Sequence, residues 1–181
     1  EMKIVRSLSL PEFCPPELDN DDKEPQSMKM FFLLRLLLRL RDEGERTLVF
    51  SQSTRMLDLI QRTVVKFGFT FMRIDGSVSS SAERQRRIDL FNQSSAEEYF
   101  CFLLTTGVGG LGLNLTSATR VVIVDPAWSP IDNQAVDRVY RLGQNQNVVV
   151  YRLITCGTVE EKIYRKQVFK GSLMKTAMER S

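Results

Sequence analysis

The 181-residue chain contains no histidine, the side chain that proteins most often use as a general base and as a metal ligand near neutral pH. Its absence excludes Ser/His and Cys/His nucleophile systems. Cysteine is scarce, because only Cys14, Cys101 and Cys156 occur, and they are too far apart for a paired zinc-binding motif. We therefore expect no metal site, and buried thiols in a reducing, intracellular compartment.

Long hydrophobic runs are also missing. No apolar run reaches the roughly 18 residues that a membrane-spanning helix needs, and the longest candidate, MKMFFLLRLLLRL at 28–40, is interrupted by Arg35 and Arg39. The N-terminus lacks the basic start, apolar segment and small-residue cleavage site of a secretory signal. We expect a soluble protein without a membrane partner, and the start at Glu1 leads us to expect a fragment of a longer chain.

The phosphate-binding motif GxxxxGK[ST] of nucleotide hydrolases does not occur in the chain. A different glycine-rich run, TTGVGGLGLNL at 105–115, contains four glycines whose backbone N–H groups could approach an anion closely. The same composition is typical of an ordinary tight turn. If the protein handles ATP, this chain supplies only part of the site.

Charge is distributed unevenly along the sequence. The formal net charge is +3, but residues 1–27 carry −4 and the remainder carries +7. The acidic, proline-rich segment is typical of a linker or an irregular surface segment. The basic body favours a polyanionic partner, although many proteins of similar charge bind none.

Apolar runs and helical patterns alternate through the body. Short runs typical of strands buried on both faces occur at 47–51, 69–74, 99–105, 120–125 and 148–154. Helical patterns occur at 27–42, 53–67, 81–93, 131–142 and after Gly157. This order predicts a doubly wound α/β fold with right-handed crossovers, in which ligands bind at the carboxyl ends of the strands.

The stretch QAVDRVYRLGQ at 134–144 places Gln134, Arg138 and Arg141 on one helical face. Two guanidinium groups on one face can serve an anionic ligand. They can also be a solvated surface, in which Asp137 and Arg141 form an i,i+4 ion pair.

The single tryptophan, Trp128, lies in RVVIVDPAWSP, where a predicted strand ends at Asp125 and two prolines follow. It can pack beneath the turn, or it can stack on a base or wedge against a nucleic-acid backbone.

Taken in order, five segments resemble the second RecA-like lobe of superfamily two helicases, and specifically the Snf-type DNA-dependent ATPases. Within these, the chain is most similar to the excision-repair-cross-complementing group 6-like proteins, which include the Polo-kinase-interacting checkpoint helicase. The segments are VFSQ (49–52), RIDGS (73–77), LLTTGVGGLGLNL (103–115), QAVDRVYRLGQ (134–144) and YRLITCGTVEEKIYRKQVFK (151–170).

The resemblance implies roles for particular residues. Arg138 and Arg141 would be arginine fingers that reach a triphosphate, with Gln134 orienting them. Gly110, Gly112 and Asn114 would lie beside the nucleotide. The residues expected to contact the DNA backbone are Ser51, Gln52, Gly76, Ser77, Thr105 and Thr106, with Trp128 as a further candidate.

The resemblance also implies an organisation and a function. We expect an acidic linker at 1–27, a RecA-like lobe with a three-layer parallel sheet at 28–156, and a C-terminal brace helix at 157–181. The chain would be the C-terminal motor lobe of a nuclear, ATP-dependent translocase of double-stranded DNA, with roles in chromatin remodelling or DNA repair. Its partners would be duplex DNA, bare or in nucleosomes, and the N-terminal lobe of the same protein, which binds most of the ATP with Mg²⁺. The lobe alone would be inactive.

Two departures from the family pattern stand out. Gly107 occupies a position where many relatives carry a longer polar or basic side chain, and SPIDN (129–133) is one residue shorter than usual. The shortened segment favours a rival interpretation, a non-catalytic nucleic-acid or protein-binding module on a helicase-like fold. An RNA helicase lobe is the other rival.

Overall fold

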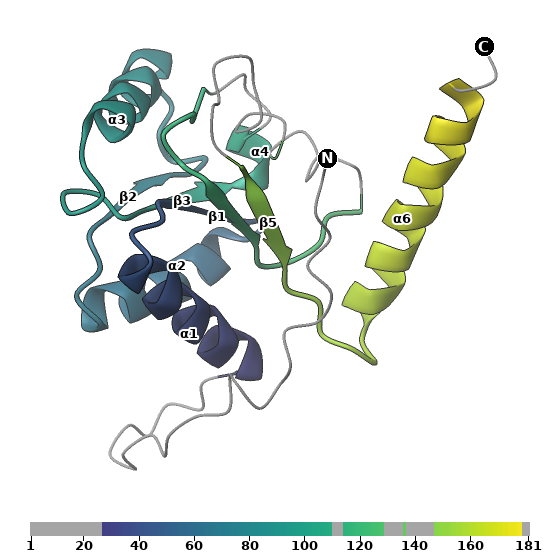
Figure 1. Ribbon diagram of the computed structural model, residues 1–181. Coiled ribbons are helices and arrows are strands. Elements are labelled where there is room, and N and C mark those ends of the chain that lie inside the picture. Colours follow the sequence, from purple (N-terminus) through teal and green to yellow (C-terminus); the bar gives the residue numbers. More distant parts are fainter. Residues whose placement is uncertain (1–26, 110–113, 129–135, 137–146, 179–181) are drawn as a thin grey trace.

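The computed structural model describes residues 27–109, 114–128, 136 and 147–178, which include one parallel sheet in the strand order β2-β3-β1-β4-β5. The strands are β1 (Thr47–Ser51), β2 (Phe71–Ile74), β3 (Cys101–Thr105), β4 (Arg120–Ile123) and β5 (Val149–Arg152). The helices are α1 (Met28–Asp42), α2 (Thr54–Lys66), α3 (Ser81–Gln93), α4 (Thr106–Gly109) and α6 (Val159–Met178). Figure 1 shows helices on both sides of the sheet and α6 standing beyond its β5 end, so the expected three-layer α/β fold is confirmed.

Alternation along the central strands separates two hydrophobic cores. In β1, Val49 packs with α1 and α2 in one core, whereas Leu48 and Phe50 pack with α3 and α4 in the other. All three side chains are fully buried. Because both faces of β1 are covered, its three central residues, Leu48, Val49 and Phe50, are all apolar rather than alternating with polar ones.

Serines begin three of the helices. The hydroxyls of Ser27, Ser53 and Ser80 each accept a hydrogen bond from the backbone N–H three residues later, at 3.3, 3.4 and 3.3 Å. These bonds satisfy N–H groups that have no partner within the helix. Glycines end two of the same helices, because Gly44 after α1 and Gly68 after α2 adopt φ of +73° and +66°, which side chains with a Cβ rarely tolerate.

β1 has the predicted bounds, and the other four strands are shorter than the sequence predicted. Residues 69 and 70 were expected in β2 but precede it, and the Phe69 N–H donates to the Val64 carbonyl at the end of α2. The helical turn α4 was not predicted, since its glycine-rich sequence is typical of a loop. The helix predicted at 131–142 lies outside the described residues except for Val136, which packs against the α3 side of the sheet.

The thiols are only partly as expected. Cys101 is fully buried in β3, which raises the pKa of its thiol well above the usual range, but Cys156 is exposed in the turn before α6. Cys14 lies outside the described residues. The prediction of buried thiols is therefore wrong for Cys156, because the segment between β5 and α6 runs over the surface.

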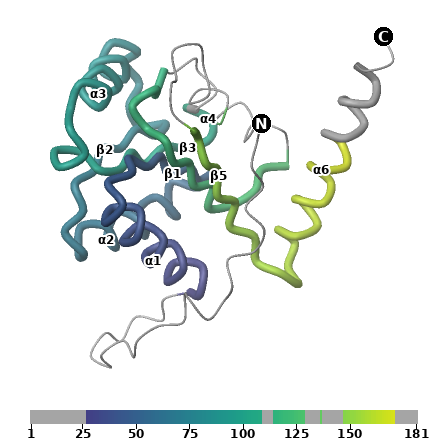
Figure 2. Tube along the Cα trace, in the orientation of Figure 1, coloured from purple at the N-terminus to yellow at the C-terminus, as the bar shows by residue number. Residues whose placement is uncertain are grey.

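Among the described helices, none combines the length and apolar character that crossing a membrane requires. The tube in Figure 2 shows α6 continuing away from the sheet. Among residues 159–170 of this helix, whose side chains the structure describes, only Ile163 is buried.

Arg46 ties the connection between α3 and β3 to the start of β1. Its guanidinium donates to the carbonyls of Phe91, Ser94 and Tyr99 at 2.5, 2.8 and 3.2 Å, and it lies 3.9 Å from the centre of the Phe91 ring. The residue is 9% exposed. One side chain therefore bonds to carbonyls at the end of α3 and in the segment before β3.

We expect Arg46→Ala to lower the free energy of unfolding by about 2–4 kcal/mol, because it leaves these carbonyls without a charged donor. Arg86→Ala is the control, since Arg86 makes an exposed i,i+3 pair with Glu83 and its loss should change the free energy of unfolding far less. Urea denaturation of both variants measures the difference. Equal midpoints would show that the Arg46 contacts contribute no net stability.

Candidate functional site at the carboxyl edge of the sheet

The strand register brings four predicted segments to one edge of the sheet. Ser51, the last residue of β1, pairs with Thr105, the last residue of β3, while Ile74 of β2 pairs with Leu104. Because all strands are parallel, the residues that follow each strand meet at the same edge. This carboxyl edge is therefore formed by the ends of β1, β2, β3 and β4.

Asp125 holds the end of β1 from the neighbouring strand. Its carboxylate accepts hydrogen bonds from the Ser51 hydroxyl at 3.1 Å and from the Gln52 N–H at 3.1 Å. The Gln52 side-chain amide donates to the Pro126 carbonyl at 2.5 Å. Ser51 is fully buried and Gln52 is exposed, so only Gln52 faces solvent. Both residues are held by the same Asp125 carboxylate.

Asp75 organises the turn after β2 in a similar way. Its carboxylate accepts from the Ser77 hydroxyl at 2.6 Å and the Ser77 N–H at 2.9 Å, and it pairs with Arg73 at 2.6 Å. Arg73 also pairs with Asp58 at 2.6 Å. Gly76 and Ser77 are exposed at the tip of this turn, which is thereby fixed in shape.

The two aspartates are in opposite electrostatic situations. Burial raises the pKa of the Asp125 carboxyl, and the hydrogen bonds from Ser51 and Gln52 offset this only in part. The Ser77 hydroxyl is the largest influence on Asp75 and lowers the pKa of that carboxyl, with Arg73 acting in the same direction against burial. Asp75 therefore stabilises its turn as an anion, whereas Asp125 is held at a cost in desolvation.

Thr105 and Thr106 stand between these two turns, at the junction of β3 and α4. They are 8% and 4% exposed. Gly107, the next residue, is exposed, and a Cβ added there would meet nothing within 4 Å. Asn114 is exposed beyond the glycine-rich run, and its carbonyl accepts from the Asn92 amide at 2.8 Å.

Trp128 projects from the turn after β4 and is 61% exposed. The alternative in which it packs beneath the turn is therefore wrong. The Lys166 ammonium of α6 lies 5.7 Å from the centre of its ring, within the range of a cation–π contact. The Gln167 amide of α6 donates to the Ala127 carbonyl, so this helix contacts the turn at two consecutive positions.

Five predicted site residues lie outside the described residues, namely Gln134, Arg138, Arg141, Gly110 and Gly112. The structure brings the remaining candidates together at the carboxyl edge, whereas the Asn114 carbonyl bonds to Asn92 of α3. Their roles in binding stay predictions.

Sequence reasoning missed Asp75 and Asp125 as the residues that shape this edge. Each is an isolated acid that follows a buried apolar strand, and this position in the sequence could have indicated a role at the ends of the strands. Nothing in the sequence indicated the partners, because Asp125 and Ser51 are 74 positions apart.

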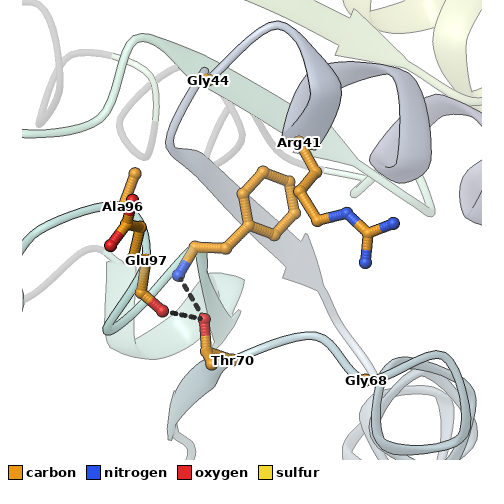
Figure 3. Close-up of a pocket in the computed structure, with 7 residues that line it drawn as sticks. Arg41, Gly44, Gly68, Thr70, Ala96 and Glu97 are labelled. Carbon is orange, nitrogen blue, oxygen red and sulfur yellow. Dashed lines mark hydrogen bonds between the residues drawn. The ribbon is translucent and has the colours of Figure 1, made fainter.

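A pocket of about 420 Å³ lies elsewhere, at the amino ends of β2 and β3. Figure 3 shows Arg41 and Glu97 on different sides of it, with Thr70 between them. The Thr70 hydroxyl donates to the Glu97 carbonyl at 3.2 Å and accepts from the Phe100 N–H at 3.1 Å. This pocket is at the edge of the sheet opposite to the predicted site residues.

Comparison with known proteins gives a family and several relatives. Residues 28–143 match the family of helicase conserved C-terminal domains. The chain is 60% identical over 160 residues to the human DNA excision repair protein ERCC-6-like, covering 88% of this chain and 13% of that protein. It is 52% identical over 185 residues to the SNF2 domain-containing protein ENL1 of Oryza sativa subsp. japonica, covering 99% of this chain and 18% of that protein.

A solved structure is similar over most of the fold. The crystal structure of the C-terminal part of the Fun30 ATPase domain superimposes with a TM-score of 0.74 at 37% identity, covering 82% of this chain and 47% of that one. The chain therefore spans less than a fifth of each of the two curated relatives and about half of the solved neighbour.

The lowered pKa of Asp75 generates a pH-dependent prediction. We expect Asp75→Asn to lower the free energy of unfolding by about 2–3 kcal/mol at pH 7, because the ion pair with Arg73 and the charged acceptor for Ser77 are lost. Since the native pKa lies below the unfolded value of about 3.9, this stabilisation is present above about pH 4 and is lost as pH falls through the native pKa.

The free energies of unfolding of wild type and Asp75→Asn should therefore differ less at pH 3 than at pH 7. Urea denaturation at the two pH values measures this difference. Asp42→Asn is the control, since the Asp42 side chain is 77% exposed. A difference that stays constant across this range would mean that the charge of Asp75 contributes nothing.

Proposed function

Because the chain belongs to the family of helicase conserved C-terminal domains, we propose that it is the second motor lobe of an ATP-dependent translocase of double-stranded DNA. The resemblance to the C-terminal lobe of Snf-type ATPases is confirmed by the similarity to ERCC-6-like proteins and to the Fun30 ATPase domain. Several relatives carry names of DNA repair or chromatin remodelling proteins, which supports a nuclear protein with one of these roles.

The observation that carries the proposal is the alignment of exposed, uncharged hydrogen-bonding groups along the carboxyl edge. Gln52 follows β1 and is held by Asp125, while Gly76 and Ser77 follow β2 in a turn that is held by the buried Asp75. Amide, hydroxyl and backbone N–H groups can hold phosphates without reading bases. We propose that this edge grips one DNA strand independently of its sequence.

Not every predicted contact serves the grip in the same way. The hydroxyl of the fully buried Ser51 is donated to Asp125, so we propose that Ser51 positions Gln52 rather than touching DNA itself. Ser77 likewise donates both its hydroxyl and its N–H to Asp75, so we propose that it fixes the shape of the β2 turn rather than donating to a phosphate. A Gln side chain has two N–H donors, and the Pro126 carbonyl accounts for one of them. Thr105 and Thr106 lie between the β1 and β2 turns and would donate their hydroxyls once DNA lies across the edge.

For ATP, we propose a division between two lobes. The chain lacks GxxxxGK[ST], so the N-terminal lobe would hold Mg²⁺ and most of the triphosphate. Gly110, Gly112 and Asn114 would lie beside the nucleotide sugar, and Arg138 and Arg141 would neutralise charge developing on the transferred phosphoryl group. Alternate closure and opening of the two lobes would then move the grip along the strand.

DNA binding by this chain should be weak and blind to sequence, and its logarithm should fall linearly with the logarithm of salt concentration. Gly107→Lys should raise the affinity and steepen the salt slope by about 0.9, because the added ammonium reaches a phosphate from an open position on α4. Fluorescence anisotropy with two unrelated duplexes at several salt concentrations measures both quantities.

Val65→Lys is the matched control, since Val65 is 59% exposed near the end of α2, at the opposite edge of the sheet, and should leave the slope unchanged. Equal effects of the two lysines would argue against a DNA grip at the carboxyl edge.

In the full-length enzyme, we expect Arg138→Lys and Arg141→Lys to lower DNA-stimulated ATP turnover by about 10³- to 10⁵-fold, the usual cost of losing an arginine finger. Lysine keeps the charge but lacks the planar fork. If Arg141 served only an ion pair with Asp137, the variant would lose about 0.3–0.5 kcal/mol of stability and keep its activity.

Steady-state ATPase with saturating duplex DNA, single-stranded DNA or RNA is the measurement, with Arg39→Lys as the control. Arg39 pairs with Glu43 on the exposed side of α1, remote from the carboxyl edge. Near-normal turnover in both folded variants would refute the arginine-finger role. Stimulation by RNA alone would indicate an RNA helicase lobe, and a wild-type enzyme without turnover would indicate a binding module.

A further inference from the structure

Lys29 joins three segments that are far apart in the sequence. Its ammonium donates to the Val124 carbonyl at 2.9 Å and to both carboxylate oxygens of Glu160 at 2.6 Å. Lys29 lies in the first turn of α1, Val124 directly follows β4, and Glu160 lies in the first turn of α6. A single charged group therefore fixes the base of α6 to the end of a central strand.

The pair is partly shielded from water. The Lys29 and Glu160 side chains are 12% and 25% exposed, and Glu160 also accepts from the Thr155 N–H at 2.9 Å. An ion pair in such a position is screened less than a surface pair, and removing one partner leaves the other charge without compensation. This contact is thus sensitive to the loss of either member.

The segment that Lys29 holds continues into the carboxyl edge. Val124 precedes Asp125, which binds Ser51 and Gln52, and the turn ends at the exposed Trp128. Further along α6, Gln167 donates to Ala127 and Lys166 lies over Trp128. Helix α6 therefore contacts both ends of the 124–128 turn, through Lys29 at the first residue and directly at the last two.

We propose that Lys29 and Glu160 are positioning residues that couple the orientation of α6 to the DNA grip, so that each ATP turnover is converted into movement along DNA. The inference rests on the proposed translocase function. A shift of α6 relative to α1 would displace the Val124 carbonyl and residues Ala127 and Trp128 together. Because Asp125 lies between them and binds Gln52, the displacement would also move Gln52 at the end of β1.

Glu161 provides a matched control in the adjacent position. Its carboxylate accepts from the Gly157 N–H at 2.8 Å and pairs with Arg165 at 2.5 Å, both within its own segment. Glu160→Gln and Glu161→Gln are the same chemical change in the same helical turn. Only the first removes a link to α1 and β4.

The test uses the full-length enzyme with Lys29→Met, Glu160→Gln, the double variant and Glu161→Gln. Two quantities are compared: DNA-stimulated ATP turnover, and displacement of a triplex-forming strand expressed per ATP hydrolysed. We expect Lys29→Met and Glu160→Gln to keep turnover within about twofold but to lose at least about fivefold in displacement per ATP, the lower range of a coupling energy. The double variant should lose no more than either single variant, because both remove one contact.

Thermal melting separates this role from a purely structural one. A lower melting temperature with unchanged displacement per ATP would overturn the inference, as would values equal to those of Glu161→Gln. If Lys29→Met unfolds, Lys29→Arg keeps the charge pair and should retain the coupling, while the isosteric Glu160→Gln still tests its loss. A wild-type enzyme without DNA-stimulated turnover would refute the proposed function itself, which distinguishes that failure from the failure of this inference.

Discussion

The fixed register of the parallel sheet is the constraint on which the rest of the molecule depends. Its central strands β1 and β3 are fully buried apart from the slightly exposed Thr105, with side chains entering a different core on each face. A slip of one residue would exchange the two sets of side chains and leave both cores badly packed. Because no such slip is tolerated, Ser51, Asp75, Thr105 and Asp125 end up along one edge.

Two acidic side chains convert this alignment into a shaped surface. Asp75 is an anion well supplied with donors, and it makes the β2 turn rigid. Burial raises the pKa of the Asp125 carboxyl, which joins β4 to the end of β1. The groups that face solvent, chiefly Gln52, Gly76 and Ser77, are neutral and are held by these acids, which under the proposed function suits repeated binding and release of phosphates.

Helix α6 is attached both to α1 and to the turn after β4 at this edge. Under the proposed function, this lobe supplies the DNA grip and arginine fingers, while the N-terminal lobe supplies the phosphate-binding loop and Mg²⁺. Helix α6 reaches away from the sheet, yet its base is fixed by Lys29 and Glu160, and its middle by Gln167 and Lys166. Under the proposed function, these contacts would let α6 transmit a change in the N-terminal lobe to the turns proposed to bind DNA.

The sequence by itself determined the α/β class, the strands of the sheet and the family, because apolar runs buried on two faces and short motifs are local signals that survive without knowledge of the fold. It also placed Ser51, Ser77 and Thr105 at or just after the ends of strands, and all parallel strands end on the same side. Strand ends were less certain, because Phe69 and Thr70 are apolar or β-branched, but Phe69 closes α2 and Thr70 bonds to the segment before β3. Only the tertiary structure decided that Ser51 is buried against Asp125, that Arg46 serves the carbonyls before β3, and that Lys29 meets Glu160. Each of these contacts joins residues 45 to 131 positions apart, and no local pattern encodes such a pairing.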